Sequence, residues 1–330
     1  MTTTPMNETE LLASLRILSC VAKADGATSS DELKRLESCL EGAPLPTGIT
    51  IPSILAETPD LEKQLALLTS PECREQTFQA AFAVAHVDGQ CSTGEQKILD
   101  RMCANWNLPK EDPALLGRLV REVKDTVLPS NIQAVPDAGK RKAEIQSDTL
   151  KYSILSGVLG AFPVPGLSLA TDMAVVGIQV KLVRDIGQRW GHTVDQKAAN
   201  SILTGLGLGT GARIAVNTLL KFVPVAGVVW GASTSFASTW ALGEVANQYF
   251  EAGAKTDIST YREAFRKASG EGQAAYKTHQ AAVATANTQH AAALKALGEE
   301  LKLGTLSPEN YGKKVSELAA LPALQARQAL

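Results

Sequence analysis

The sequence predicts an all-α protein, and three observations carry that prediction. Apolar residues recur at helical spacing along most of the chain, and turn signals built on Gly and Pro separate the periodic segments. Aromatic residues make up only 5% of a chain that is 45% hydrophobic, so its cores must be built mainly from Ala, Leu and Val. Apolar side chains three and four positions apart share one face of a helix.

Length and composition divide the chain into four parts. Because 330 residues exceed one typical core, two or three folding units are expected. We expect a helical domain at residues 1–128, a linker at 129–150, a Gly-rich apolar helical-hairpin domain at 151–253 and an Ala-rich helical tail at 254–330. Between Tyr152 and Gly253 only 11 of 102 residues are charged, and 14 of the 26 glycines of the chain lie there.

Charge and cysteine content restrict the partners and the compartment. The net charge is −2 without clustered Lys and Arg, which predicts no nucleic-acid partner. The five cysteines include no C-x-x-C pair, and the first residues lack the basic and apolar regions of a signal peptide. We therefore expect reduced thiols and a cytoplasmic location.

Helical periodicity in the first domain predicts six helices. They are expected at Leu11–Ala22, Ser30–Leu40, Leu61–Leu68, Glu72–Val87, a segment carrying Ile98 to Trp106, and Pro113–Leu128. Pro44, Pro46, Gly48 and Pro52 predict a loop between the second and third helices.

A repeat links two of the predicted helix junctions. Val21–Glu32 and Val84–Glu95 both follow the pattern V-A-x-x-D-G-x-x-S-x-x-E, 63 residues apart. The Ser-x-x-Glu half of each predicts a capping box, with Ser29 and Ser92 as N-caps. Each repeat is therefore expected to join two helices, and we call the two copies the acidic joints.

The leading aspartates of the acidic joints allow two interpretations. Asp25 and Asp88 would lie at helix C-termini, where the helix dipole disfavours an anion. One interpretation is an Asx-turn, which is favoured because a divalent cation requires six or more oxygen ligands. The other is a cation held by Asp25, Glu32, Asp88 and Glu95. Gly94 is expected to weaken the second copy.

The duplicated joint in a helical domain resembles the TerB-like (tellurite resistance) domain over about residues 8–128. The resemblance implies a helical fold, a role in stress response and divalent metal, Ca²⁺ or Mg²⁺, bound at Asp25, Glu32, Asp88 and Glu95.

The central block is expected to contain broken helices. One apolar helix, Tyr152–Ala161, should end at Phe162-Pro163-Val164-Pro165-Gly166. Leu167–Trp190 should form an amphipathic helix with Lys181, Arg184, Asp185 and Gln188 on its polar side. Residues 197–222 contain four alternating glycines, and a last helix should follow Val223-Pro224-Val225-Ala226-Gly227 and reach Phe250.

The apolar character of this block leaves two interpretations open. Membrane-embedded hairpins would explain the uncharged runs and the small-xxx-small pairs Gly205/Gly209 and Gly207/Gly211. A helical bundle, soluble or peripherally attached, would use the glycines for close helix packing. A nucleotide loop is disfavoured because no Gly-Lys-Ser/Thr follows the glycines. Three adjacent bases, Lys140 to Lys142, could contact anionic lipid, although a solvated helix face is favoured.

The block also resembles the YcjF-type domain of unknown function over about residues 145–252. The match lies in the Pro-x-Pro-Gly turn, Asp172…Gln179…Gly191, Lys221-Phe222-Val223-Pro224 and Thr239…Tyr249-Phe250. It implies proximity to the bacterial inner membrane, through lipid or a membrane protein, and a GTPase partner.

The tail is expected to form three helices. A charged helix, Ile258–Ala268, should stop at Gly270-Glu271-Gly272, and an Ala-rich helix should follow from Gln273 to Leu303. Ser307 should cap the last helix, with Pro308 in its first turn. This end resembles the short SHOCT module, which implies a homo-oligomer.

The chain carries no H-E-x-x-H, G-x-S-x-G or P-loop motif, so we expect it not to be an enzyme. The expected function is that of a stress-response or adaptor protein that is peripheral to or inserted in the inner membrane. Two alternatives remain: a soluble oligomeric scaffold that partners a GTPase, and a pore-forming helical protein.

Overall fold

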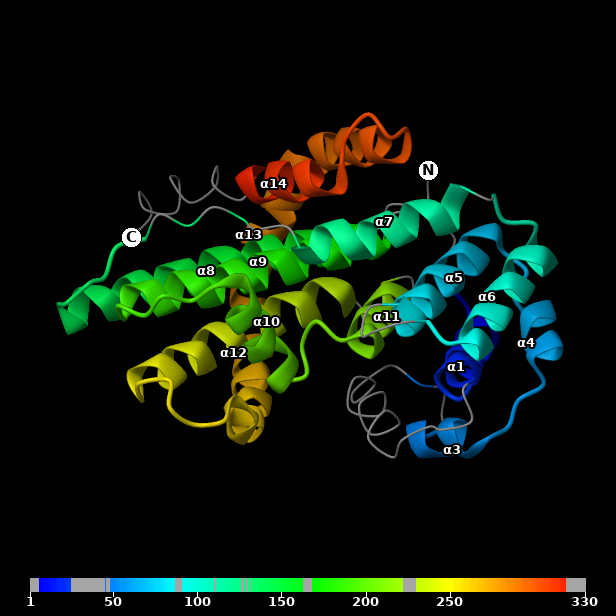
Figure 1. Cartoon of the computed structure of the whole chain (residues 1–330), viewed down its shortest axis with the longest axis horizontal. Helices are drawn as coiled ribbons and strands as arrows, with labels where there is room; N and C mark the ends of the chain where they lie inside the picture. The colour runs from blue at the N-terminus through cyan, green and yellow to red at the C-terminus, as the bar shows by residue number, and fades with distance from the viewer. Residues whose placement is uncertain are drawn as a thin grey trace. The chain divides into compact units, whose positions relative to one another are not determined.

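The computed structural model of the chain describes residues 6–24, 45, 48–86, 91–109, 111–125, 128, 130, 132–162, 168–221 and 230–318. Every regular element within these ranges is a helix, as Figure 1 shows, and the all-α prediction is confirmed. The helix predicted at Ser30–Leu40 lies outside the described residues.

The described helices belong to two compact units that are discontinuous in sequence. The first unit contains α1 (Glu8–Ala22), α3 (Ile51–Ala56), α4 (Leu61–Leu67), α5 (Pro71–His86), α6 (Thr93–Trp106), most of α7 (Glu111–Asp125), the first turn of α9 (Ser168–Arg189) and α11 (Gly211–Leu220). The second contains α8 (Ala138–Ala161), the rest of α9, α10 (Gln196–Gly205), α12 (Trp230–Glu251) after its first residue, the 3-10 helix η1 (Ile258–Tyr261), α13 (Arg262–Lys302) and α14 (Pro308–Leu318).

Local capping explains where most helices begin. Asn7 caps α1, Asp137 caps α8 and Asp195 caps α10, in each case by accepting a hydrogen bond from a backbone N–H of the first turn. The loop was predicted to include Pro52, which is wrong, because α3 already begins at Ile51. Thr50 accepts from the Ser53 N–H at 3.3 Å, and Pro52 occupies the first turn, where no backbone N–H is needed.

α9 contributes to both units and is largely buried. The predicted polar side is its least buried face, because Lys181, Arg184 and Gln188 are half-buried. Asp185 on the same side is nevertheless only 1% exposed. A buried carboxylate needs hydrogen-bond donors, and Tyr152 and Lys181 supply them.

The run of alternating glycines forms a turn and not a helix face. α10 ends at Gly205 and α11 begins at Gly211, while Gly207 and Gly209 between them have φ of +83° and +67°. The predicted small-xxx-small pairs are thus wrong, because their members do not share a helix. Glycine is required here for the left-handed backbone.

Close helix packing through glycine occurs elsewhere. A Cβ at Gly160 of α8 would lie 2.1 Å from the carbonyl oxygen of Gly231 in α12. A Cβ at Gly272 of α13 would lie 2.8 Å from the carbonyl oxygen of Ala237 in α12. α13 consequently continues without a break from Arg262 to Lys302, and the predicted stop at Gly270-Glu271-Gly272 is wrong. The predicted Ser307 cap of α14 is confirmed, since its Oγ accepts from the Asn310 N–H at 3.2 Å.

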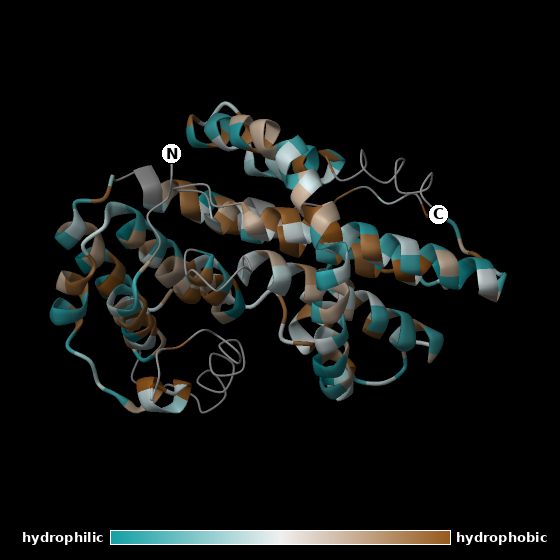
Figure 2. Cartoon of the chain, turned by 180° about the vertical axis from the view of Figure 1, so that it is seen from behind, coloured by the Kyte–Doolittle hydropathy of each residue, from teal (hydrophilic) through white to brown (hydrophobic). Residues whose placement is uncertain are grey.

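None of the helices in the described ranges combines the length and hydropathy needed to cross a bilayer. The colours in Figure 2 accordingly change between hydrophobic and hydrophilic within each long helix.

Candidate functional site

The 63-residue repeat has a counterpart in three dimensions. Ser14 of α1 and Thr77 of α5 are 63 positions apart, and their hydroxyl oxygens lie 2.7 Å from each other in the core. Glu10 and Cys73 are also 63 positions apart, and the thiol donates to the carboxylate at 3.5 Å. Residues one turn apart on α1 thus meet their own repeat equivalents on α5. The two helices run in the same direction, in the register of the repeat.

This register brings the acidic joints to the same end of the helix pair. A Cβ at Gly94 would lie 2.2 Å from the carbonyl oxygen of Ala24. Ala24 directly precedes Asp25, and Gly94 directly precedes Glu95. The edges of the two joints are therefore in contact, and Gly94 allows that contact.

Of the four predicted metal ligands, the structure places one. Asp25, Glu32 and Asp88 lie outside the described residues. Glu95 forms the predicted capping box of α6: its Oε2 accepts from the Ser92 N–H at 2.7 Å, and its own N–H donates to Ser92 Oγ at 3.2 Å. Within the described part of the chain, no three His, Cys, Asp or Glu side chains converge to hold a metal ion.

Glu10 is a buried carboxylate that the sequence analysis did not single out. It is 3% exposed and accepts from the Thr69 N–H at 3.3 Å, the Ser70 N–H at 3.2 Å and Thr69 Oγ1 at 3.2 Å. Burial raises its pKa, but hydrogen bonds from Ser70, Asn7, Thr69 and the Cys73 thiol lower it further, below its usual value. Burial also raises the pKa of Cys73 to about 11, so this residue stays a thiol and can donate. The site anchors the chain at the start of α5.

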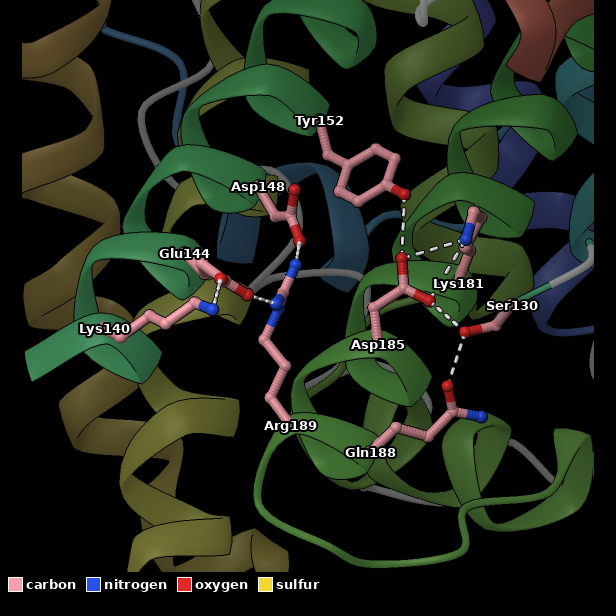
Figure 3. Close-up of polar contacts among 9 residues, drawn as sticks. All are labelled: Ser130, Lys140, Glu144, Asp148, Tyr152, Lys181, Asp185, Gln188 and Arg189. Atoms are coloured by element: carbon pink, nitrogen blue, oxygen red, sulfur yellow. Dashed lines mark hydrogen bonds and ion pairs between the residues drawn. The ribbon is translucent and has the colours of Figure 1, made fainter. Parts of the chain in front are cut away.

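In the second unit, Asp185 is the centre of a polar cluster between α8 and α9 (Figure 3). Tyr152 Oη donates to it at 2.8 Å, and Lys181 Nζ lies 2.9 and 3.1 Å from its two oxygens. Ser130 Oγ also contacts Asp185 and lies 2.7 Å from Gln188 Oε1. Burial, and next the charge of Asp185, raise the pKa of Tyr152 well above its usual value. The phenol therefore acts only as a donor.

Arg189 extends this cluster to the last turn of α9. Its guanidinium pairs with Glu144, which Lys140 also approaches at 3.9 Å, and with Asp148 at 2.5 Å. Figure 3 shows these side chains meeting between α8 and α9, which run antiparallel. The charges of the cluster neutralise one another inside the unit, so the cluster positions α8 on α9.

The basic residues at the start of α8 are partly engaged within the fold. The Arg141 guanidinium lies 3.7 Å from the ring centroid of Trp190 and donates to the carbonyl oxygens of Val135, at 2.7 Å, and Pro136, at 3.2 Å. Lys142 is exposed. Lys140 is exposed as well, so any contact of this triplet with an external anion would rely on the two lysines rather than on Arg141.

In the first unit, the structure pairs Asp172 with Lys221. The sequence analysis named these two residues in separate motifs of the resemblance to the YcjF-type domain and did not connect them. Nζ of Lys221 lies 2.8 Å from Oδ1 of Asp172, and the two side chains are 1% and 2% exposed. Nothing in the spacing of the two residues indicated this contact.

Comparison of the chain with family models, curated proteins and solved structures found no match. The resemblances to the TerB-like domain, the YcjF-type domain and the SHOCT module therefore stay predictions.

Proposed function

We propose that the protein is a non-enzymatic adaptor that links an acidic sensing or docking unit to a helical unit acting at the inner membrane, through lipid, a membrane protein or a GTPase. The main support is α9. This helix contributes its first turn to the first unit and the remainder to the second, and none of its residues is exposed. A helix that belongs to two units is suited to carry a rearrangement from one to the other.

The chemistry of the buried polar groups fits a structural role. Asp185 is neutralised by Lys181, Arg189 by Glu144 and Asp148, and Glu10 is enclosed by donors. A catalytic group must be able to reach a substrate atom. These carboxylates instead hold helices together, which supports the proposal of an adaptor over that of a hydrolase or transferase.

The proposed membrane contact is peripheral. The apolar residues of α9 and α11 are used inside the fold, which favours a surface contact over embedded hairpins. Lys140 and Lys142 at the start of α8 are both exposed, and of the two Lys140 lies 3.9 Å from Glu144. Each basic residue near an anionic bilayer contributes about 1 kcal/mol.

Fractionation of cells that express the chain at native level tests this proposal. We expect part of the protein in the membrane fraction, released by carbonate at high pH. On vesicles with anionic lipid, Lys142→Glu should weaken binding about tenfold. The same charge reversal at exposed Lys277 of α13 is the matched control and should have little effect. A protein that remains wholly in the soluble fraction and does not bind vesicles would exclude the membrane part. Release of a trapped dye would instead favour the pore-forming alternative.

The proposed sensing function requires its own test. Calorimetric titration with Ca²⁺ and Mg²⁺ should give heat with the wild type and none with Asp25→Asn or Asp88→Asn. Glu95→Gln is informative because a glutamine retains the capping box while removing the charge. If the wild type shows neither heat nor a thermal shift, the acidic joints serve only as caps.

A further inference from the structure

A buried ion pair joins the first turn of α9 to the end of α11. Besides the 2.8 Å contact between Lys221 Nζ and Asp172 Oδ1, Thr218 Oγ1 donates to Asp172 Oδ2 at 2.6 Å. Lys221 also donates to Thr171 Oγ1 at 2.8 Å and to the Ser168 carbonyl oxygen at 3.4 Å. Burial raises the pKa of Asp172 above its usual value, and Lys221 and then Thr218 offset only part of this rise. The ionised form thus depends on these two partners.

The same two segments rest on α5 through buried polar contacts. Gln76 Nε2 donates to the Thr218 carbonyl oxygen, and its Oε1 accepts from Ser168 Oγ at 3.3 Å. Gln79 Oε1 accepts from the Leu169 N–H at 3.0 Å. α5 therefore binds the α9 turn and α11 by a set of hydrogen bonds that closes only when both segments are present.

Apolar contacts complete this joint. α11 buries Ile214, Val216, Leu219 and Leu220, and Gly211 brings its start close to the backbone of Ala83, where a Cβ would lie 2.5 Å from the carbonyl oxygen. Detachment of α11 would expose this apolar face.

The ion pair lies where α9 passes from one unit to the other. Asp172 is the last residue of α9 in the first unit, and Met173 is the first in the second. Thirteen positions further along α9, Asp185 anchors the helix within the second unit through Lys181 and Tyr152. Each end of α9 thus has its own buried carboxylate with a lysine partner.

We propose that the Asp172–Lys221 pair is a releasable clamp: when it opens, α11 and the first turn of α9 leave α5 together while the second unit stays folded. Desolvation offsets much of the attraction in a buried ion pair, so such a pair contributes little net stability. Removal of one partner, however, leaves an unpaired buried charge and is strongly destabilising. Whether α11 stays attached therefore depends on a single contact, the pair between Asp172 and Lys221. The clamp would regulate the α9 link of the proposed adaptor, and its opening can be measured whether or not that function is correct.

Hydrogen exchange read by mass spectrometry on the full chain tests the clamp. Lys221→Met removes one partner of the pair. We expect exchange in α11 and the first turn of α9 to rise about 100-fold, while α8 and α13 stay within about twofold of the wild type. Lys181→Met is the matched control, because it removes the lysine partner of Asp185. It should accelerate exchange in α8 and the second half of α9 and leave α11 unchanged.

If Lys221→Met does not fold, the double variant Asp172→Leu/Lys221→Met tests the clamp in its place. An apolar pair of similar volume removes the unpaired charge, so α11 should exchange more slowly than in the wild type. Exchange at the wild-type rate or faster in this variant would overturn the clamp. A uniform rise in both units, or no rise in α11 of Lys221→Met, would also overturn it. Neither result affects vesicle binding by the wild type, which tests the adaptor proposal separately.

Discussion

Replacement of Glu10 by alanine removes the acceptor that holds the start of α5. In the native unit this carboxylate is 3% exposed and accepts at 3.3 and 3.2 Å from the N–H groups of Thr69, an exposed residue, and Ser70, a half-buried one. A hydrogen bond to a charged group contributes about 1.5–3 kcal/mol, and water can replace the acceptor at Thr69, so we expect a loss of about 1.5–3 kcal/mol in the free energy of unfolding. The Cys73 thiol loses its acceptor as well, which favours the upper half of this range.

Urea unfolding followed by far-UV circular dichroism would measure the loss. Glu8→Ala is the control, because Glu8 lies in the same first turn of α1 but is exposed, and its replacement should change stability by less than about 0.5 kcal/mol. Equal midpoints for the two variants would refute the assignment of Glu10 as the anchor of α5.

The pH dependence gives a second check on Glu10. Its pKa is lowered in the folded state from a usual value of 4.5, so the unfolded state binds the proton more tightly. The stability from this group is therefore fully present above pH 4.5 and is lost as the pH falls through the lower folded value. Glu10→Ala should lose less stability than the wild type over that acid range. Parallel acid unfolding curves for the two proteins would contradict the hydrogen-bonded, ionised carboxylate.

Four further substitutions test other features of the fold. Gly94→Ala should destabilise the first unit by about 2–4 kcal/mol in calorimetry, because its Cβ would lie 2.2 Å from the Ala24 carbonyl oxygen; an unchanged transition would disprove the contact between the acidic joints. Gly207→Ala should cost about 1–2 kcal/mol because its φ is +83°, whereas Gly177→Ala, in the interior of α9 with open space at Cβ, should stabilise by about 0.5–1 kcal/mol; the same sign for both would argue against the turn. Tyr152→Phe should cost about 1–2 kcal/mol near pH 7. Because the folded pKa of Tyr152 is raised, its contribution is present below the unfolded value and is lost at alkaline pH; an ultraviolet titration in which all tyrosines ionise near pH 10 without unfolding would contradict this burial.

Several features followed from the sequence because they depend on neighbours within one or two turns. The Ser92–Glu95 capping box, the Ser307 cap and the end of α8 at Ala161 all rest on contacts at most four residues apart. Helical periodicity likewise predicted the positions of α1, α4, α5 and α6, because apolar residues at helical spacing mark the buried face of a helix.

The tertiary structure alone decided which polar residues meet. Asp185 was expected on the polar side of α9, and it is buried because α8 brings Tyr152 against it. Asp172 and Lys221 are 49 positions apart, and their pairing depends on how α9 and α11 both rest on α5. In the sequence Glu10 is an ordinary acidic residue, and only the structure shows that the start of α5 buries it.

The sequence by itself determined that the chain is helical, where most described helices begin and end, and that the acidic joint is duplicated. Only the tertiary structure determined that the repeat sets the register of α1 against α5, that α13 continues through Gly270 and Gly272, and that α9 has a buried carboxylate near each end. The physical reason is the range of the interactions. Caps and periodicity act within one helix, whereas burial of a charge is decided by partners that the chain brings from far along its length.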